Sequence, residues 1–263
     1  MRRSTYAARR QHRGGARPPR HREGCVLSSP PMAGVATRLL EQISIFASLP
    51  PNEIAALARI AREDTVRARE FVFREGDAAD WLCLVKRGRV KILRHARTGR
   101  DVVLELLGPG EIFGGVAVIE RRPYPAAAQA MEESEIVKLP AGPIVALAER
   151  HPAVIREMAL MMGRRLRNAH ESVRSLSVDP VETRLASTLL KLAEREGVKR
   201  QDGLALPFHL TRQSLADMTG TTVETTIRVV SRWLRDEIVV DDGGRLVLAD
   251  VEALRELAEG PDE

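Results

Sequence analysis

Two charged residues four positions apart, Glu224 and Arg228, carry the most informative chemistry in this chain of 263 residues. Side chains at this spacing share one face of a helix. Glutamate can accept a hydrogen bond from cytosine and arginine can donate two to guanine, so a helix that carries both could read base pairs. The alternative is an ordinary intrahelical ion pair on a solvated surface, which contributes little to stability.

The residues around this pair predict two helices joined by a tight turn. Thr211 and Thr222 can each cap the start of a helix, and Gly220 tolerates the left-handed conformation that ends the first one. This is the spacing of a helix-turn-helix. The segment 239–248 follows as a hairpin, so we expect residues 179–258 to form a winged helix-turn-helix that binds DNA. The candidate DNA contacts are Arg212, Gln213, Thr222, Val223, Glu224, Thr225, Ile227 and Arg228.

Motifs for enzymatic chemistry are absent from the sequence. It contains no nucleophile elbow, phosphate-binding loop, metal-ligand triad or convincing pair of carboxylates. The two cysteines, Cys25 and Cys83, cannot form a disulfide framework or a four-cysteine metal site, and the six histidines are not spaced as metal ligands. No stretch approaches about 18 uninterrupted apolar residues, so no membrane span is expected. We therefore expect a cytoplasmic protein that is not an enzyme and holds no metal.

The basic character of the chain is concentrated at its start. Residues 1–31 hold eight arginines and one acidic residue, a net charge of +7, whereas the remaining residues sum to −2. This tail lacks apolar periodicity and contains Gly-Gly and Pro-Pro pairs, which predicts disorder. It could act as a basic arm that attracts DNA phosphates. The alternative is that translation starts at Met32 and the tail is never made.

Short β-branched or alternating runs dominate the segment between 65 and 140. They fall at 71–73, 82–85, 90–93 and 102–106, with glycine-containing turns between them. Strands of this length at a spacing of about 8–12 residues predict an antiparallel sandwich or barrel. Short amphipathic helices precede the strands, so we expect residues 39–150 to form one β-rich domain.

The segment 152–178 has no internal proline, and its apolar residues recur at alternating steps of four and three. This narrow heptad pattern predicts a long helix, within 151–178, that pairs with a second copy as a two-stranded coiled coil. Packing within one chain is the alternative, although it usually needs a wider apolar stripe. Asp179 is expected to cap the next helix. The predicted seam residues are Ile155, Ala159, Met162, Leu166, Ala169, Val173 and Leu176.

Three strings in the β-rich segment resemble a known family. They are 73–77 (FREGD), 87–91 (RGRVK) and 107–114 (LGPGEIFG), and their order is similar to that in the cyclic-nucleotide-binding β-roll of the CRP/FNR regulators. The string 223–228 (VETTIR) resembles the recognition helix of the same family. The resemblance implies an α+β chain with an N-terminal antiparallel β-roll, a long dimerisation helix and a C-terminal winged helix-turn-helix.

The same resemblance implies a function. The chain would be a homodimeric transcription factor that binds a palindromic operator in double-stranded DNA, works with RNA polymerase and regulates promoters in response to a signal sensed by the β-roll. In the family the residues that match Glu224 and Arg228 read the DNA half-site. The serine that precedes the arginine in FNR-like members is Ile227 here. The alternative function is an effector-binding module that acts through protein contacts rather than DNA.

The resemblance also places a candidate effector pocket, and it argues against cyclic AMP. In cyclic-AMP-binding members a glutamate holds the ribose and an Arg-Ser pair holds the phosphate, and the aligned residues here are Gly115, Pro125 and Ala126. Proline and alanine cannot make a charge-assisted contact with phosphate. An iron–sulfur cluster is not expected either, because Cys25 is the single cysteine near the start of the chain. The effector is therefore unknown.

Two residues of the long helix, Ala169 and His170, are added to this pocket by resemblance. They align with the pair that reaches the adenine in cyclic-AMP-binding members, but neither carries the hydroxyl group expected there. The candidate pocket residues are Gly114, Gly115, Val116, Pro125, Ala126, Ala127, Ala169 and His170.

Overall fold

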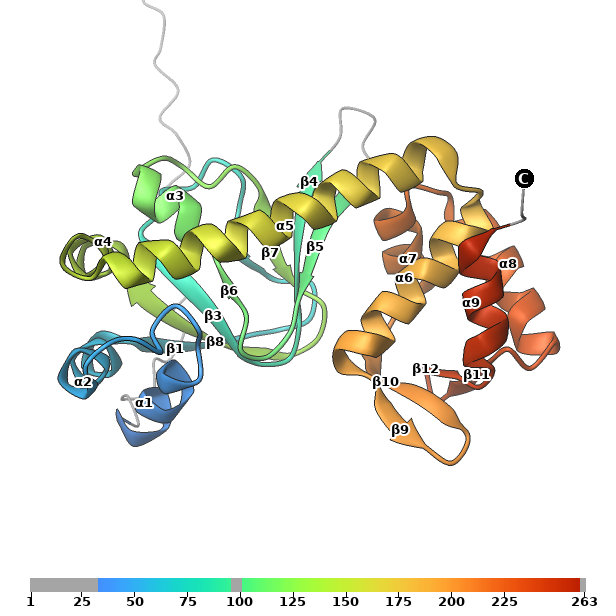
Figure 1. Ribbon diagram of the computed structural model, residues 1–263, viewed down its shortest axis with the longest axis horizontal. Coiled ribbons are helices and arrows are strands. Elements are labelled where there is room, and N and C mark those ends of the chain that lie inside the picture. Colours follow the sequence, from blue (N-terminus) through green and yellow to red (C-terminus); the bar gives the residue numbers. More distant parts are fainter. Residues whose placement is uncertain (1–32, 96–100, 261–263) are drawn as a thin grey trace, which may run out of the picture.

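The computed structural model of the chain describes residues 33–95 and 101–260 (Figure 1). The basic tail predicted over 1–31, including Cys25, lies outside the described residues. Within the described ranges the chain forms a β-roll, one long helix and a smaller C-terminal domain, in that order (Figure 1).

The N-terminal domain is built on two four-stranded antiparallel sheets. Their strand orders are β1-β8-β3-β6 and β2-β7-β4-β5. The strands are β1 (Arg62–Val66), β2 (Phe71–Phe73), β3 (Trp81–Arg87), β4 (Val90–His95), β5 (Asp101–Leu107), β6 (Ile112–Phe113), β7 (Ala127–Ala130) and β8 (Ser134–Pro140). Alternating apolar residues of the two sheets, such as Val85, Leu107 and Ile136, meet in a buried cluster between them.

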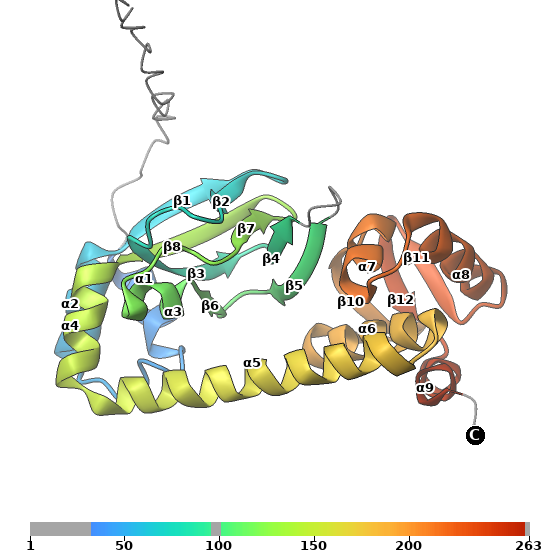
Figure 2. The same cartoon turned by 90° about the horizontal axis from the view of Figure 1, so that it is seen from above.

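The described part of this domain also contains four short helices. They are α1 (Ala33–Glu41), α2 (Pro51–Ile60), α3 (Gly115–Glu120) and α4 (Ala141–Arg150). Helices α1, α2 and α4 gather at the end of the β-roll away from the C-terminal domain (Figure 2). Residues of α2 and α4, including Leu57 and Leu147, pack with Leu82 and Leu139 of the sheet in a second buried cluster. The first helix begins at Ala33, before the predicted domain start at 39. The sequence did not indicate this earlier start, because residues 33–36 (AGVA) have no clear apolar period.

The long helix α5 (Pro152–Val178) runs alongside the β-roll and continues to the C-terminal domain (Figure 2). It buries Val154 and Met158 against the β-roll. Most of the predicted seam points elsewhere, since Leu166 and Val173 are 56% and 63% exposed, although Met162 is half-buried. The helix therefore has one apolar face in use within the chain and a second face that is open to solvent.

The C-terminal domain contains four helices and a four-stranded antiparallel sheet of order β11-β12-β10-β9 in the part of the chain described. Its core holds Leu189, Leu215, Val230 and Trp233, all of them buried. The elements are α6 (Val181–Glu196), β9 (Val198–Arg200), β10 (Gly203–His209), α7 (Arg212–Thr219), α8 (Val223–Arg235), β11 (Val239–Asp242), β12 (Arg245–Leu248) and α9 (Val251–Glu259).

The predicted fold class, α+β with a β-roll, a long helix and a winged helix-turn-helix, is confirmed. One local prediction is wrong: Asp179 does not cap α6. Its carboxylate lies 3.5 Å from the Arg174 guanidinium at the end of α5, and Pro180 occupies the position before α6. Pairing with an arginine in the last turns of the preceding helix takes the carboxylate away from the free N–H groups of the next one.

The C-terminal domain packs against strand β5 of the β-roll, where α7 lies beside the strand (Figure 2). Val103 and Leu106 of β5 belong to the same apolar cluster as the core of the C-terminal domain. At the edge of this contact, Arg89 forms an ion pair with Glu196 at the end of α6. The Arg89 guanidinium also lies 3.5 Å from the centre of the Phe208 ring. A buried cation thus joins the two domains.

We expect Glu196→Ala to weaken the contact between the two domains. The side chains of Arg89 and Glu196 are only 7% and 15% exposed, and removing one partner of a buried pair typically costs about 3–5 kcal/mol. Hydrogen exchange should therefore quicken at residues 101–107 and 212–219. The control, Asp242→Ala, removes the exposed partner of Arg200 and should leave the exchange unchanged. Equal exchange in the two variants would contradict the role given to the Arg89–Glu196 pair.

Candidate functional site

Local hydrogen bonds fix the turn between α7 and α8. The Thr211 hydroxyl accepts a hydrogen bond from the Ser214 N–H at 3.0 Å, and the Thr222 hydroxyl accepts one from the Thr225 N–H at 3.2 Å. Between the two helices Gly220 adopts φ +61°, in the left-handed region. A Cβ at Gly220 would also lie 2.6 Å from Cδ2 of Leu176, so a side chain there would require the Leu176 side chain to move. These contacts set where α8 begins and which way it points.

Helix α8 separates cleanly into a buried and an exposed face. Thr226, Val229, Val230 and Trp233 face the core, and the Trp233 Nε1–H donates to Glu182 of α6 at 2.9 Å. The opposite face repeats at helical spacing and carries most of the charge of the helix. Its residues are Glu224, Ile227, Arg228, Ser231, Arg232 and Arg235.

Glu224 and Arg228 are both exposed in the first turns of α8. No ion pair joins them in the described part of the chain, so the alternative of an intrahelical pair is not formed. The pKa of the Glu224 carboxyl lies below its ordinary value because it accepts hydrogen bonds from its own backbone N–H and then from Thr222. Arg232, by contrast, pairs with Glu182. The guanidinium of Arg228 is therefore available to a ligand.

The remaining candidate DNA contacts are held more tightly. Arg212 lies 3.7 Å from Asp241 of the β11–β12 hairpin, and its side chain is half-buried. Gln213 donates to Asp217 at 2.6 Å, and burial raises the pKa of that aspartate. Val223 and Thr225 are half-buried as well, and the Thr222 hydroxyl serves as the helix cap. These residues shape the interface, whereas Arg228 and Glu224 project from it.

A cavity of about 140 Å³ lies between the β-roll and α5. It includes five of the predicted pocket residues, Gly114, Gly115, Val116, Pro125 and Ala126. Gly114 is required by space and by its φ of +78°, because a Cβ there would lie 2.9 Å from Cε1 of Tyr124. Tyr124 stacks on Phe73 with ring centres 3.6 Å apart and donates from its hydroxyl to the Trp81 carbonyl at 2.6 Å.

Three predicted pocket residues do not line this cavity. Ala127 is buried within strand β7, in the core of the β-roll. Ala169 and His170 lie farther along α5 than the last residue of that helix to reach the cavity, Arg165, and both are exposed. The single chain therefore does not bring these three residues to the cavity, and their part in an effector site stays a prediction.

Sequence reasoning missed the charged pair that lies in the cavity wall. Arg165 of α5 forms an ion pair with Glu105 of β5 at 2.8 Å and donates to the Ile112 carbonyl at 2.6 Å. Burial raises the pKa of Glu105, and the nearby Arg165 opposes that shift. Two signals could have revealed the pair: Glu105 interrupts an apolar strand, and Arg165 continues the inward stripe of Val154 and Met158. Met161 and Met162 of α5 complete the wall.

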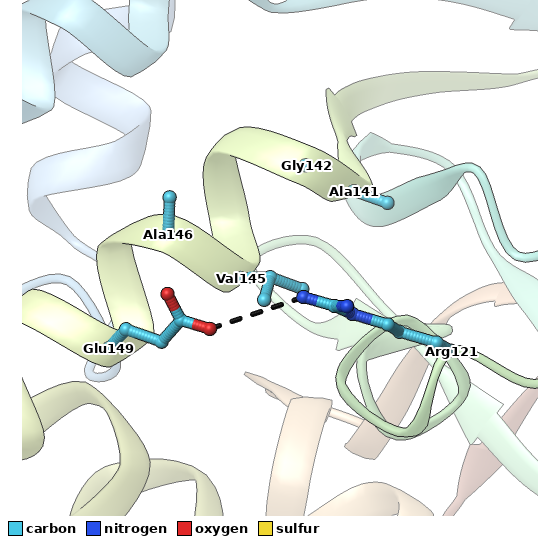
Figure 3. Close-up of a pocket in the computed structure, with 6 residues that line it drawn as sticks. All are labelled: Arg121, Ala141, Gly142, Val145, Ala146 and Glu149. Atoms are coloured by element: carbon cyan, nitrogen blue, oxygen red, sulfur yellow. Dashed lines mark ion pairs between the residues drawn. The ribbon is translucent and has the colours of Figure 1, made fainter.

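A second hollow, of about 320 Å³, lies on the surface between α3 and α4 (Figure 3). Its two charged residues point toward each other, with Arg121 Nη2 4.0 Å from Glu149 Oε1. The rest of its lining consists of Ala141, Gly142, Val145 and Ala146. Because it is shallow and its charges face each other, this hollow offers fewer features for recognition than the cavity in the β-roll.

Across residues 33–95 and 101–260, no group of three or more His, Cys, Asp or Glu side chains is arranged to hold a metal ion. Burial raises the pKa of the Cys83 thiol to about 12, so this cysteine is a small apolar core residue. Among the described helices, none is long and apolar enough to cross a lipid bilayer.

Comparisons with known proteins match both domains. The cyclic nucleotide-binding domain matches residues 63–151, and the Crp-like helix-turn-helix domain matches residues 183–257. A cyclic AMP receptor protein of Thermus thermophilus is 31% identical over 216 residues, which cover 82% of this chain and 97% of that protein. A CRP-like cAMP-activated global transcriptional regulator of Mycobacterium tuberculosis is 26% identical, with 82% and 96% covered. The solved structure of FixK2 from Bradyrhizobium japonicum has a TM-score of 0.67 at 24% identity, and the match covers 77% of this chain and 100% of that one.

A β-roll of the cyclic-nucleotide-binding type, joined by a long helix to a winged helix-turn-helix, defines a DNA-binding transcription regulator with a sensing domain. The chain belongs to the CRP/FNR family, as the two domain matches and the relative at 31% identity show. The predicted resemblance is thereby confirmed. The similar protein of Mycobacterium tuberculosis is named as a transcriptional regulator and residues 183–257 match a helix-turn-helix domain, so the alternative of a module that acts without DNA finds no support.

The cap of α8 gives a prediction for stability. Thr222→Ala removes the hydroxyl that accepts from the Thr225 N–H, which should lower the free energy of unfolding by about 1 kcal/mol. Thr221→Ala is the matched control, because its side chain makes no such bond among the described residues, and it should change stability by less than about 0.5 kcal/mol. Urea unfolding measures both. Equal midpoints for the two variants would show that Thr222 is not a cap.

Proposed function

We propose that this regulator acts as a cytoplasmic homodimer without enzymatic activity and binds a palindromic operator through α8. Each α8 would read one half-site, and the two half-sites would be about one helical turn of DNA apart. At the promoters that it regulates, the bound dimer would contact RNA polymerase. The observation that carries the proposal is the exposed, unpaired guanidinium of Arg228 beside Glu224 on the capped start of α8.

The charge distribution on α8 and α7 supports direct reading of bases. Arg228 can donate two hydrogen bonds to one guanine, and Glu224 can accept from a cytosine on the same face. Arg235 lies near the other end of the helix, where a contact with phosphate would fix position rather than sequence. The ion pair between Arg212 and Asp241 would hold the hairpin wing at a set distance from α7.

The open face of α5 supports the dimer. Its exposed apolar residues follow the predicted heptad steps along most of the helix, and burial of such a seam is the usual source of stability in a coiled coil. The seam would place the two winged helix-turn-helix domains on the same side of the dimer, as a two-fold operator requires. Residues 151–178 are therefore proposed as the dimerisation helix, between a sensor over 39–150 and a DNA-binding domain over 179–258.

The sensing domain is proposed to respond to an effector other than cyclic AMP. Two similar regulators are described by name as responding to or binding cyclic AMP. This chain has Gly115, Pro125 and Ala126 at the positions that would hold ribose and phosphate, and these side chains offer no hydrogen-bond donor. The candidate effector site is the cavity between the β-roll and α5.

The dimer is tested by charges placed on the seam. The double variant Leu166→Glu and Val173→Glu would set carboxylates against those of the partner, and we expect it to be monomeric by light scattering. Both side chains are well exposed in the single chain, so its fold should be retained. Leu160→Glu is the matched control, because Leu160 is 51% exposed on α5 but lies off the seam, and this variant should remain dimeric. A dimeric double variant would refute the coiled coil.

The reading of DNA is tested by a binding selection from randomised sequences. Arg228→Ala should cost about 1–3 kcal/mol per half-site and relax the preference at one base pair of each half-site. Arg235→Ala removes the same charge from the same helix, and it should weaken all sequences alike and reduce the salt dependence by about one unit per phosphate contact. If Arg228→Ala selected the same sequences with the same affinity as the unchanged protein, Arg228 would be no more than a surface charge.

A further inference from the structure

The cavity in the β-roll is small and mostly apolar. Its volume of about 140 Å³ is close to that of a cavity of about 150 Å³, engineered into another protein, that binds benzene. It is below the range of about 300–1,000 Å³ that is usual for sites of drug-sized ligands. Ring and methyl groups make up most of the wall, from Phe73, Phe113, Val116, Met161 and Met162. Its size and lining suit a molecule of about one aromatic ring.

The polar groups in the wall are already engaged with one another. Arg165 is neutralised by Glu105 and also donates to the Ile112 carbonyl. The Tyr124 hydroxyl donates to the Trp81 carbonyl. An anionic ligand would have to displace Glu105 from Arg165 and leave a half-buried carboxylate without this partner, next to the new negative charge. The wall is therefore built against anions.

The cavity wall includes residues of α5 and of β5, which are next to the predicted dimer seam and the DNA-binding domain respectively. Met162 lines the cavity and belongs to the predicted dimer seam. Glu105 lies on β5, whose neighbours Val103 and Leu106 pack against the DNA-binding domain. Methionine side chains adapt readily to a new neighbour because they are unbranched and flexible. A ligand in the cavity would touch both the dimer helix and the strand that contacts the DNA-binding domain.

We infer that the cavity binds a small, uncharged, mostly apolar molecule of about the size of a single aromatic ring, and that the Glu105–Arg165 pair excludes anions. This inference rests on the proposed function only in taking the cavity as the sensor site. It departs from the charged ligand class named for the similar regulators.

Calorimetry on the full-length protein can test this with three probes. Toluene should bind, and benzoate, which has the same ring with a negative charge, should bind at least tenfold more weakly. Cyclic AMP should not bind measurably. Glu105→Gln removes the carboxylate and frees Arg165. In this variant the ratio of the dissociation constants of benzoate and toluene should therefore fall at least threefold.

Two variants locate the bound toluene. Ala126→Leu fills the cavity from one wall, and Val116→Trp fills it from a position that is 39% exposed, so the second variant should fold even if the first does not. Each should weaken toluene binding at least tenfold. Ala146→Leu, the same enlargement in the surface hollow between α3 and α4, is the control and should change the affinity less than twofold (Figure 3).

The inference is overturned if toluene does not bind the folded protein, or if the Val116→Trp variant binds toluene as well as the unchanged protein does. It is also overturned if benzoate or cyclic AMP binds more tightly than toluene. Operator binding without any probe, measured on the same preparation, tests the proposed function separately. A failure to bind DNA would overturn the reading of bases by α8 and would leave the result for the cavity intact.

Discussion

Helix α5 has to satisfy two apolar faces at once, and the arrangement of the whole molecule depends on this. One face buries Val154 and Met158 against the β-roll and carries Arg165 to Glu105 in the wall of the cavity. The other face leaves Leu166 and Val173 to solvent in the single chain. Because a straight helix cannot turn one face without turning the other, the fit of the β-roll and the proposed pairing of two chains would be set by the same backbone.

Much of the fold could be predicted because it is encoded locally. Thr211, Gly220 and Thr222 each act within a few residues of their own position, so their caps and turn are legible in sequence. The seam of α5 is legible for the same reason, since heptad spacing is a property of one segment. Strands β2 to β5 could be predicted because each is a short apolar or alternating run bounded by turn residues, whereas β1, β6, β7 and β8 were not named from the sequence.

Contacts between distant segments could not be predicted. Arg89 follows Gly88 in the sequence with no local sign of burial, yet it is buried against Glu196 and Phe208 of the other domain. Glu105 and Arg165 are 60 positions apart, so the local pattern can mark each as a charge on an apolar face but cannot show that the two are partners. Ala169 and His170 were placed in the pocket by alignment alone, and the helix carries them past it. Each of these depends on how whole elements pack, which no local pattern specifies.

Leu176 is the last residue of the seam, and its Cδ2 occupies the space that a side chain at Gly220 would need. The C-terminal end of α5, the proposed dimerisation helix, thus contacts the turn that precedes α8. A step of one residue around a helix corresponds to a rotation of about 100°. If α5 turned about its own axis by even part of that step, the leucine would leave the glycine, and the seam would lose its register at the same moment. Rotation of α5 about its own axis would consequently change the pairing of two chains and the orientation of α8 at the same time.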